Sequence, residues 1–113
     1  MHEMSIISGI LNIVEEQARA AGAQVINTIE VEIGELAGVE VEALEFCFTV
    51  ARKNNLAHRA QLVIHHIAGL GRCSQCDKDV PVTYPVALCP GCGLPVFDVK
   101  QGRELRVKSI NVD

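Results

Sequence analysis

Two closely spaced cysteine pairs constrain this chain more than any other feature of its sequence. Cys73-Ser-Gln-Cys76 and Cys89-Pro-Gly-Cys92 are separated by residues 77–88. Two residues between cysteines allow the chain to turn so that both thiolates reach one ion, and two such turns supply a tetrahedral shell of four sulfurs. We therefore predict that Cys73, Cys76, Cys89 and Cys92 bind a structural Zn(II) ion.

Other uses of the cysteines fit the sequence less well than structural zinc. An iron site of the rubredoxin type has similar ligands, but only Tyr84 and Phe97 provide aromatic side chains nearby. A catalytic zinc ion needs an open coordination position, which four thiolates do not leave. No secretory signal is predicted, so the expected location is the cytoplasm, where disulfides are rare. The fifth cysteine, Cys47, is predicted to be a small buried core residue.

The composition argues against several classes of function. The formal net charge is −4 and no basic stripe is present, so nucleic acid and anionic membrane surfaces are not expected partners. No segment approaches the roughly 20 apolar residues of a membrane-spanning helix. The sequence lacks a nucleotide-binding loop, a Ser-His-Asp order and a paired-carboxylate pattern, so we expect the protein not to be an enzyme.

Apolar periodicity outside the cysteine region predicts two helices and three strands. Helical spacing runs from Met4 to Ala21, and Gly22 is placed to end this helix in a left-handed conformation. Alternating apolar and acidic residues predict a strand over 29–33. A second helix is predicted over 39–54, and further strands over 60–68 and 104–112.

These elements predict an α+β fold, in which two helices lie on a small three-stranded sheet with an inserted four-cysteine module like a zinc ribbon. The acidic outer face of strand 29–33 and the basic outer face of strand 104–112 suit adjacent pairing. Opposite charges on neighbouring strands contribute roughly 0.2–1 kcal/mol per pair. We expect residues 1–69 plus 100–113 to form an α/β domain and residues 70–99 to form the zinc-binding module.

The first residues, Met1-His2-Glu3, offer a metal site of a different kind. The amine of Met1, the amide nitrogen of His2 and Nδ1 of its imidazole close one five-membered and one six-membered chelate ring. This set suits a square-planar ion able to displace an amide proton, namely Ni(II) or Cu(II). The fourth ligand is left open between the amide nitrogen of Glu3, a side chain and water. Taken alone, these residues favour a frayed terminus that binds nothing over a metal site.

The whole chain resembles the HypA family of hydrogenase nickel-incorporation proteins. The resemblance is carried by Met1-His2-Glu3 at the start of an amphipathic helix, by the stretch EIGELAGVEVEALEFCF and by the two cysteine pairs. It implies that His2 binds nickel together with backbone nitrogens of Met1 and Glu3, so that 1–69 plus 100–113 is the nickel-binding domain. It also implies that the four cysteines hold zinc.

The resemblance further implies a function and partners. The protein would be a nickel metallochaperone that delivers Ni(II) into the precursor of the [NiFe]-hydrogenase large subunit, with a nickel-pathway GTPase as a second partner. The resemblance also leaves open a homodimer, and some relatives serve urease. The alternative is a structural zinc-ribbon interaction module without a nickel role. Such a module needs a basic or aromatic surface, which the composition does not provide.

Overall fold

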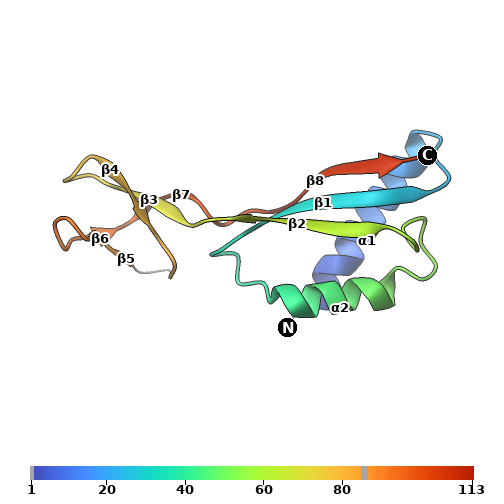
Figure 1. Cartoon of the computed structure of the whole chain (residues 1–113), viewed down its shortest axis with the longest axis horizontal. Coiled ribbons are helices and arrows are strands. Elements are labelled where there is room, and N and C mark those ends of the chain that lie inside the picture. Colours follow the sequence, from blue (N-terminus) through green and yellow to red (C-terminus); the bar gives the residue numbers. More distant parts are fainter. Residues whose placement is uncertain (1, 85–86) are drawn as a thin grey trace. The chain divides into compact units, whose positions relative to one another are not determined.

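The computed structural model describes residues 2–84 and 87–113 (Figure 1). Over these residues the chain forms two helices, α1 (Glu3–Ala20) and α2 (Val41–Ala51). Its longer strands are β1 (Ile26–Gly34), β2 (Gln61–Ile67) and β8 (Leu105–Val112). The shorter strands are β3 (Leu70–Cys73), β4 (Lys78–Pro81), β5 (Ala87–Leu88), β6 (Pro95–Val96) and β7 (Asp98–Gln101). No helix within the described residues is long and apolar enough to cross a membrane.

Helix α1 is amphipathic in the way its sequence predicts. Its buried residues follow the three- and four-residue spacing of one helical face: Ile7, Ile10, Leu11, Val14 and Ala18. Glu3 in the first turn and Arg19 in the last turn complement the helix dipole. The helix ends before Gly22, whose φ of 76° lies in the left-handed region that glycine tolerates, as predicted.

The main sheet has the strand order β2-β1-β8, which confirms the predicted pairing of the first and last strands. Ile29 and Val31 of the central strand are fully buried. Acidic side chains on the strand's other face bind β8: Glu30 accepts a hydrogen bond from Ser109, and Glu32 forms an ion pair with Arg106. The observed architecture therefore confirms the predicted α+β class with two helices and a three-stranded sheet.

Helix α2 buries only a narrow face. Leu44 and Phe48 are its buried residues, and the Arg52 guanidinium lies over the Phe48 ring, 5.0 Å from the ring centroid. Phe46 and Val50 are exposed. Cys47 is half-buried rather than buried as predicted, because it lies at the edge of the packed face, between the buried and the exposed side chains.

The cysteine region folds into short strands that the sequence did not predict individually. Strand β3 pairs antiparallel with β4 and with β7, and β5 and β6 form a separate antiparallel pair. The side chains buried between these strands are two of the cysteines and three valines: Cys73, Cys89, Val80, Val82 and Val96. This core is much smaller than that of the helices and the main sheet.

The chain divides into two compact units. The helical unit comprises Met1–Val31, Val39–Ile64 and Val107–Asp113, and the cysteine unit comprises Glu32–Gly38 and His65–Arg106. These limits differ from the range of 70–99 that was expected for the zinc-binding module, because backbone hydrogen bonds connect residues 34–36 to the cysteine unit. The Leu36 N–H donates to the Gly102 carbonyl oxygen, and the Glu35 N–H donates to the Ile67 carbonyl oxygen. The assignment of nickel to one part and zinc to the other stays a prediction.

Candidate metal centres

The structure brings the four paired cysteines together at one point of the cysteine unit. Within the described residues, Cys73, Cys76, Cys89 and Cys92 form a group whose sulfur atoms all lie within 4.8 Å of one another. The Sγ atoms of Cys73 and Cys92 are 3.5 Å apart, and those of Cys89 and Cys76 are 3.8 Å apart. Cys73 and Cys89 are buried, whereas Cys92 is exposed. Each cysteine is free of disulfides.

Both cysteine pairs are held in the same kind of turn. In the first, Cys76 N–H donates to Cys73 Sγ at 3.5 Å; in the second, Gly91 N–H donates to Cys89 Sγ at 3.3 Å. A residue with positive φ follows each pair: Asp77 at 51° and Gly93 at 76°. Backbone amides therefore point at the sulfurs in both turns, which stabilises negative charge on them.

The electrostatics of the cluster favour a bound cation. Burial disfavours the Cys89 thiolate, but the backbone N–H groups of Gly91 and Cys92, together with hydrogen bonds from the Cys73 and Cys76 side chains, lower the Cys89 pKa to about 6. Hydrogen bonding to Cys89 is the main cause that raises the pKa of Cys76 to about 12. One sulfur of the group is thus readily ionised and a neighbour resists ionisation. A cation among the sulfurs removes this conflict, since it stabilises all four thiolates.

The donor set fits zinc. Tetrahedral zinc with Zn–S bonds of about 2.3 Å requires sulfur atoms roughly 3.8 Å apart, close to the two separations given above. A Cβ added at Gly91 would lie 3.3 Å from Cys76 Sγ and 3.0 Å from Lys78 Nζ. Glycine at this position therefore permits the second turn to approach the first. The nearby Lys78 ammonium partly offsets the negative charge of four thiolates.

At the other predicted site, the structure places His2 at the N-cap of α1. Its C=O accepts the Ile6 N–H, and its exposed side chain makes no capping hydrogen bond. The Glu3 carboxylate accepts a hydrogen bond from the Glu40 N–H at 3.1 Å, which is the main cause that lowers the Glu3 pKa. The start of α1 is thereby tied to the start of α2. Met1 lies outside the described residues.

Comparison with known proteins decides the family. A family model described as hydrogenase/urease nickel incorporation, metallochaperone, hypA matches residues 1–112. The chain belongs to the HypA family. The predicted resemblance is therefore confirmed over almost the whole sequence.

Individual HypA proteins match at full length. The hydrogenase maturation factor HypA of Chlorobium phaeobacteroides (strain BS1) is 42% identical over 113 residues, with 100% of both chains covered. That of Chlorobium luteolum (strain DSM 273 / BCRC 81028 / 2530) is 46% identical, with 100% of this chain and 97% of the relative covered. The solution structure of the Ni metallochaperone HypA from Helicobacter pylori is 26% identical and superposes with a TM-score of 0.68. That comparison covers 99% of this chain and 97% of the other.

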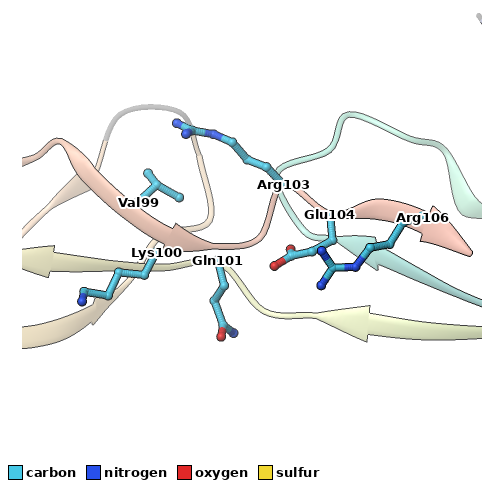
Figure 2. A pocket seen from close by; sticks show the side chains of 6 residues that line it. All are labelled: Val99, Lys100, Gln101, Arg103, Glu104 and Arg106. Atoms are coloured by element: carbon cyan, nitrogen blue, oxygen red, sulfur yellow. The ribbon is translucent and has the colours of Figure 1, made fainter. Parts of the chain in front are cut away.

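An open pocket of about 270 Å³ beside β7 and β8 does not form a further site in this HypA chain (Figure 2). Figure 2 shows Arg103 pointing away from Lys100 and Gln101. The Gln101 side-chain amide donates a hydrogen bond to the Ala68 carbonyl oxygen, and Arg106 forms an ion pair with the Glu32 carboxylate. The polar ends lining the pocket therefore do not converge on one ligand position.

Sequence reasoning missed two structural residues of the HypA cysteine unit. Asp77 takes a left-handed conformation, as Gly93 does at the equivalent position of the second turn. Lys78 follows it in the sequence, but its position near Gly91 depends on how the two turns pack. The only sequence signal for Asp77 was chemical, because aspartate tolerates positive φ better than most residues.

Proposed function

We propose that this HypA protein delivers Ni(II) into the precursor of the [NiFe]-hydrogenase large subunit. The observation that carries the proposal is the full-length match to a nickel-incorporation family, joined to a four-sulfur cluster in the same chain. Nickel is the cargo and leaves the protein. Zinc is the resident metal and stays.

The zinc ligands in this proposal are Cys73, Cys76, Cys89 and Cys92. A closed shell of four thiolates gives zinc no open position for substrate, so the ion organises structure. Because two of the ligands also form part of the small buried core, zinc would connect the β5–β6 pair to the sheet of β3, β4 and β7.

The nickel ligands in this proposal are the imidazole of His2 and backbone nitrogens of Met1, His2 and Glu3. Two structural observations support the site. The His2 side chain is exposed at the N-terminal end of α1, where a client protein can reach it. The Glu3 carboxylate is held by the Glu40 N–H, which anchors the helix start while leaving the preceding backbone available. An exposed chelate of this kind can be transferred one ligand at a time.

The proposed partners are the hydrogenase large-subunit precursor and a GTPase of the nickel pathway, in the cytoplasm. The protein would act by stoichiometric transfer of nickel rather than as an enzyme. The family description also names urease as a destination of nickel. The alternative function, a zinc-ribbon interaction module without nickel, finds less support, because the family match extends over the N-terminal residues and not only over the cysteine unit.

The nickel site is tested by changing His2 and by blocking the chain terminus. We expect His2→Ala to abolish stoichiometric nickel binding, because it removes the six-membered chelate ring. Extending the N-terminus by two residues turns the amine into an amide and removes the five-membered ring. Neither change touches a cysteine or a buried residue, so bound zinc should be unchanged in both variants. Nickel and zinc are measured side by side by elemental analysis after nickel loading and dialysis.

His66→Ala is the matched control, since His66 is another exposed histidine but lies in β2, away from the chain terminus in the sequence. It should bind as much nickel as the unchanged protein. Nickel must displace protons from its ligands, so binding should also weaken as the pH falls. If the extended protein binds nickel as tightly as the unextended one, the terminal chelate is refuted, and His58, His65 and His66 become the candidates.

A further inference from the structure

The pairing of β3 with β4 places a lysine beside the sulfur cluster. Lys78, the first residue of β4, pairs with Cys73, the last residue of β3. Directly paired residues of antiparallel strands point to the same face of the sheet. The Lys78 side chain therefore leaves β4 on the face from which Cys73 enters the cluster. Lys78 is exposed, whereas Cys73 is buried.

The Lys78 ammonium also reaches the second cysteine turn. A Cβ added at Gly91 would lie 3.0 Å from Lys78 Nζ and 3.4 Å from its Cε. The same point is 3.3 Å from Cys76 Sγ, so the ammonium and this sulfur are close neighbours beside Gly91. Gly91 lies between Cys89 and Cys92 in the sequence. One cation is thus near both turns of the cluster.

The acidic neighbours of Lys78 in the sequence are bound elsewhere. Asp77 and Asp79 both pair with Arg72, at 2.8 Å and 3.1 Å. Arg72 and Asp79 are register partners across β3 and β4, so they lie on the opposite face of the sheet from Lys78. Lys78 itself forms no ion pair within residues 2–84 and 87–113. Its charge is therefore available to the sulfurs.

The hydrogen bonds of the cluster show which sulfur gains most from this cation. Backbone N–H groups donate to the sulfurs of Cys73, Cys89 and Cys92. Cys76 is the fourth sulfur, and the Lys78 ammonium lies beside it. Backbone N–H groups and the ammonium thus together stabilise negative charge on all four sulfurs.

The charge of a metal-bound cluster explains what such a cation does. Four thiolates around one Zn(II) ion carry two net negative charges, which a nearby ammonium stabilises. We propose that Lys78 is a positioning residue of the zinc site: its ammonium holds the Cys76 thiolate in the metal-bound cluster and thereby slows the loss of zinc. This role rests on the four zinc ligands proposed above. Lys78 does not bind the metal itself, since an ammonium has no lone pair to donate.

Retention of zinc matters in a protein whose cargo is nickel. A four-thiolate site without zinc is open to other divalent metals of the first transition series. Nickel taken up there would not be available for transfer from the chain terminus. By keeping the zinc site filled, the lysine keeps the two metals apart.

The rate of zinc release tests the role of Lys78. The zinc-loaded full chain is mixed with excess pyridylazoresorcinol, a chelator whose absorbance reports the zinc it takes up. We expect Lys78→Met to release zinc about threefold faster than the unchanged chain and Lys78→Glu about tenfold faster, modest effects for a neighbour of metal ligands because the lysine is exposed. Lys78→Arg keeps the charge and should not change the rate. The chelator is an anion, so electrostatic steering alone would slow its attack on the Met and Glu variants.

Lys100 provides the matched control, because it is an exposed lysine of the same unit in β7. Its neighbour Gln101 pairs with Leu70, at the end of β3 opposite to Cys73. Lys100→Met and Lys100→Glu change the net charge equally and should leave the release rate unchanged. Raising the salt from about 0.1 M to about 1 M shortens the Debye length from about 10 Å to about 3 Å and should bring the rates of Lys78→Met and the unchanged chain together. The loss of a packing contact would not respond to salt in this way.

Zinc content distinguishes failure of this role from failure of the zinc site on which it rests. Elemental analysis and circular dichroism establish zinc content and folding before each release experiment. An unchanged chain without bound zinc would refute the four-cysteine site, and the role of Lys78 with it. One zinc per chain throughout, with equal release rates for Lys78→Glu and Lys100→Glu, would refute the role of Lys78 alone. Release from Lys78→Arg as fast as from Lys78→Met would do the same. A Met or Glu variant of Lys78 that folds but holds no zinc, while Lys78→Arg holds it, is the limiting case of the expected result.

Discussion

Replacing Cys73 with serine is expected to release zinc and to unfold the cysteine unit, while the helical unit stays folded. The buried core of the cysteine unit consists of Cys73, Cys89 and three valines. Without the metal, those valines bury too little apolar surface to order the short strands of this unit, since small domains of this kind need a staple. Structural zinc contributes an apparent free energy of roughly 10–16 kcal/mol in small zinc domains, which is comparable with the whole stability of a typical protein.

The helical unit has a core of its own, drawn from α1, β1 and α2, with Ile7, Val14, Ile29 and Leu44 fully buried. Hydrogen exchange of Cys73→Ser should therefore show lost protection in residues 70–98 and retained protection in α1. Cys47→Ser is the matched control, because Cys47 lies outside the sulfur group and should leave zinc at its original level. Retention of one zinc per chain by Cys73→Ser after dialysis against a mild chelator would contradict the four-cysteine site.

The helices and the main sheet could be predicted because their patterns are long. Helix α1 repeats its apolar face over most of its length, and β1 alternates Ile and Val with Glu over several residues. The charges of Glu32 and Arg106 even indicated which strands are neighbours, since complementary outer faces favour adjacent strands. The pattern of each helix or strand lies in residues a few positions apart, where backbone periodicity makes it readable.

The metal ligands of the cysteine unit could be predicted from the sequence, but its short strands and its limits could not. The CxxC spacing is local and brings two sulfurs together by turn geometry alone, so all four members of the group were identified. Strands β5 and β6 have only two residues each, too few for any period to be recognised. The unit's limits depend on pairings between residues far apart in the sequence, such as Gly34 with Glu104. Partial burial of Cys47 likewise depends on how α2 packs, because Cys47 lies beside the packed face of the helix rather than on it.

Gly34→Ala should be among the most destabilising substitutions outside the metal ligands. Gly34, the last residue of β1, is buried, and its N–H donates to the Glu104 carbonyl oxygen at 2.7 Å. A Cβ at this position would lie 2.0 Å from the Gly102 oxygen and 2.7 Å from the Arg103 nitrogen. Both atoms belong to the backbone, so no side-chain rotation relieves the clash. Gly102 itself has a φ of 119°, which restricts how that segment can move.

We expect Gly34→Ala to lower the free energy of unfolding by about 3 kcal/mol or more, at the upper end of overpacking effects. The melting temperature should then fall by roughly 10 °C or more for a chain of this size. Gly9→Ala is the matched control: Gly9 lies in α1 with nothing within 4 Å of an added Cβ, so the variant should gain about 0.5–1 kcal/mol from helix propensity. The two substitutions add the same methyl group and should shift the melting temperature in opposite directions. Equal melting temperatures for Gly34→Ala and the unchanged protein would show that the backbone around Gly102 can move aside.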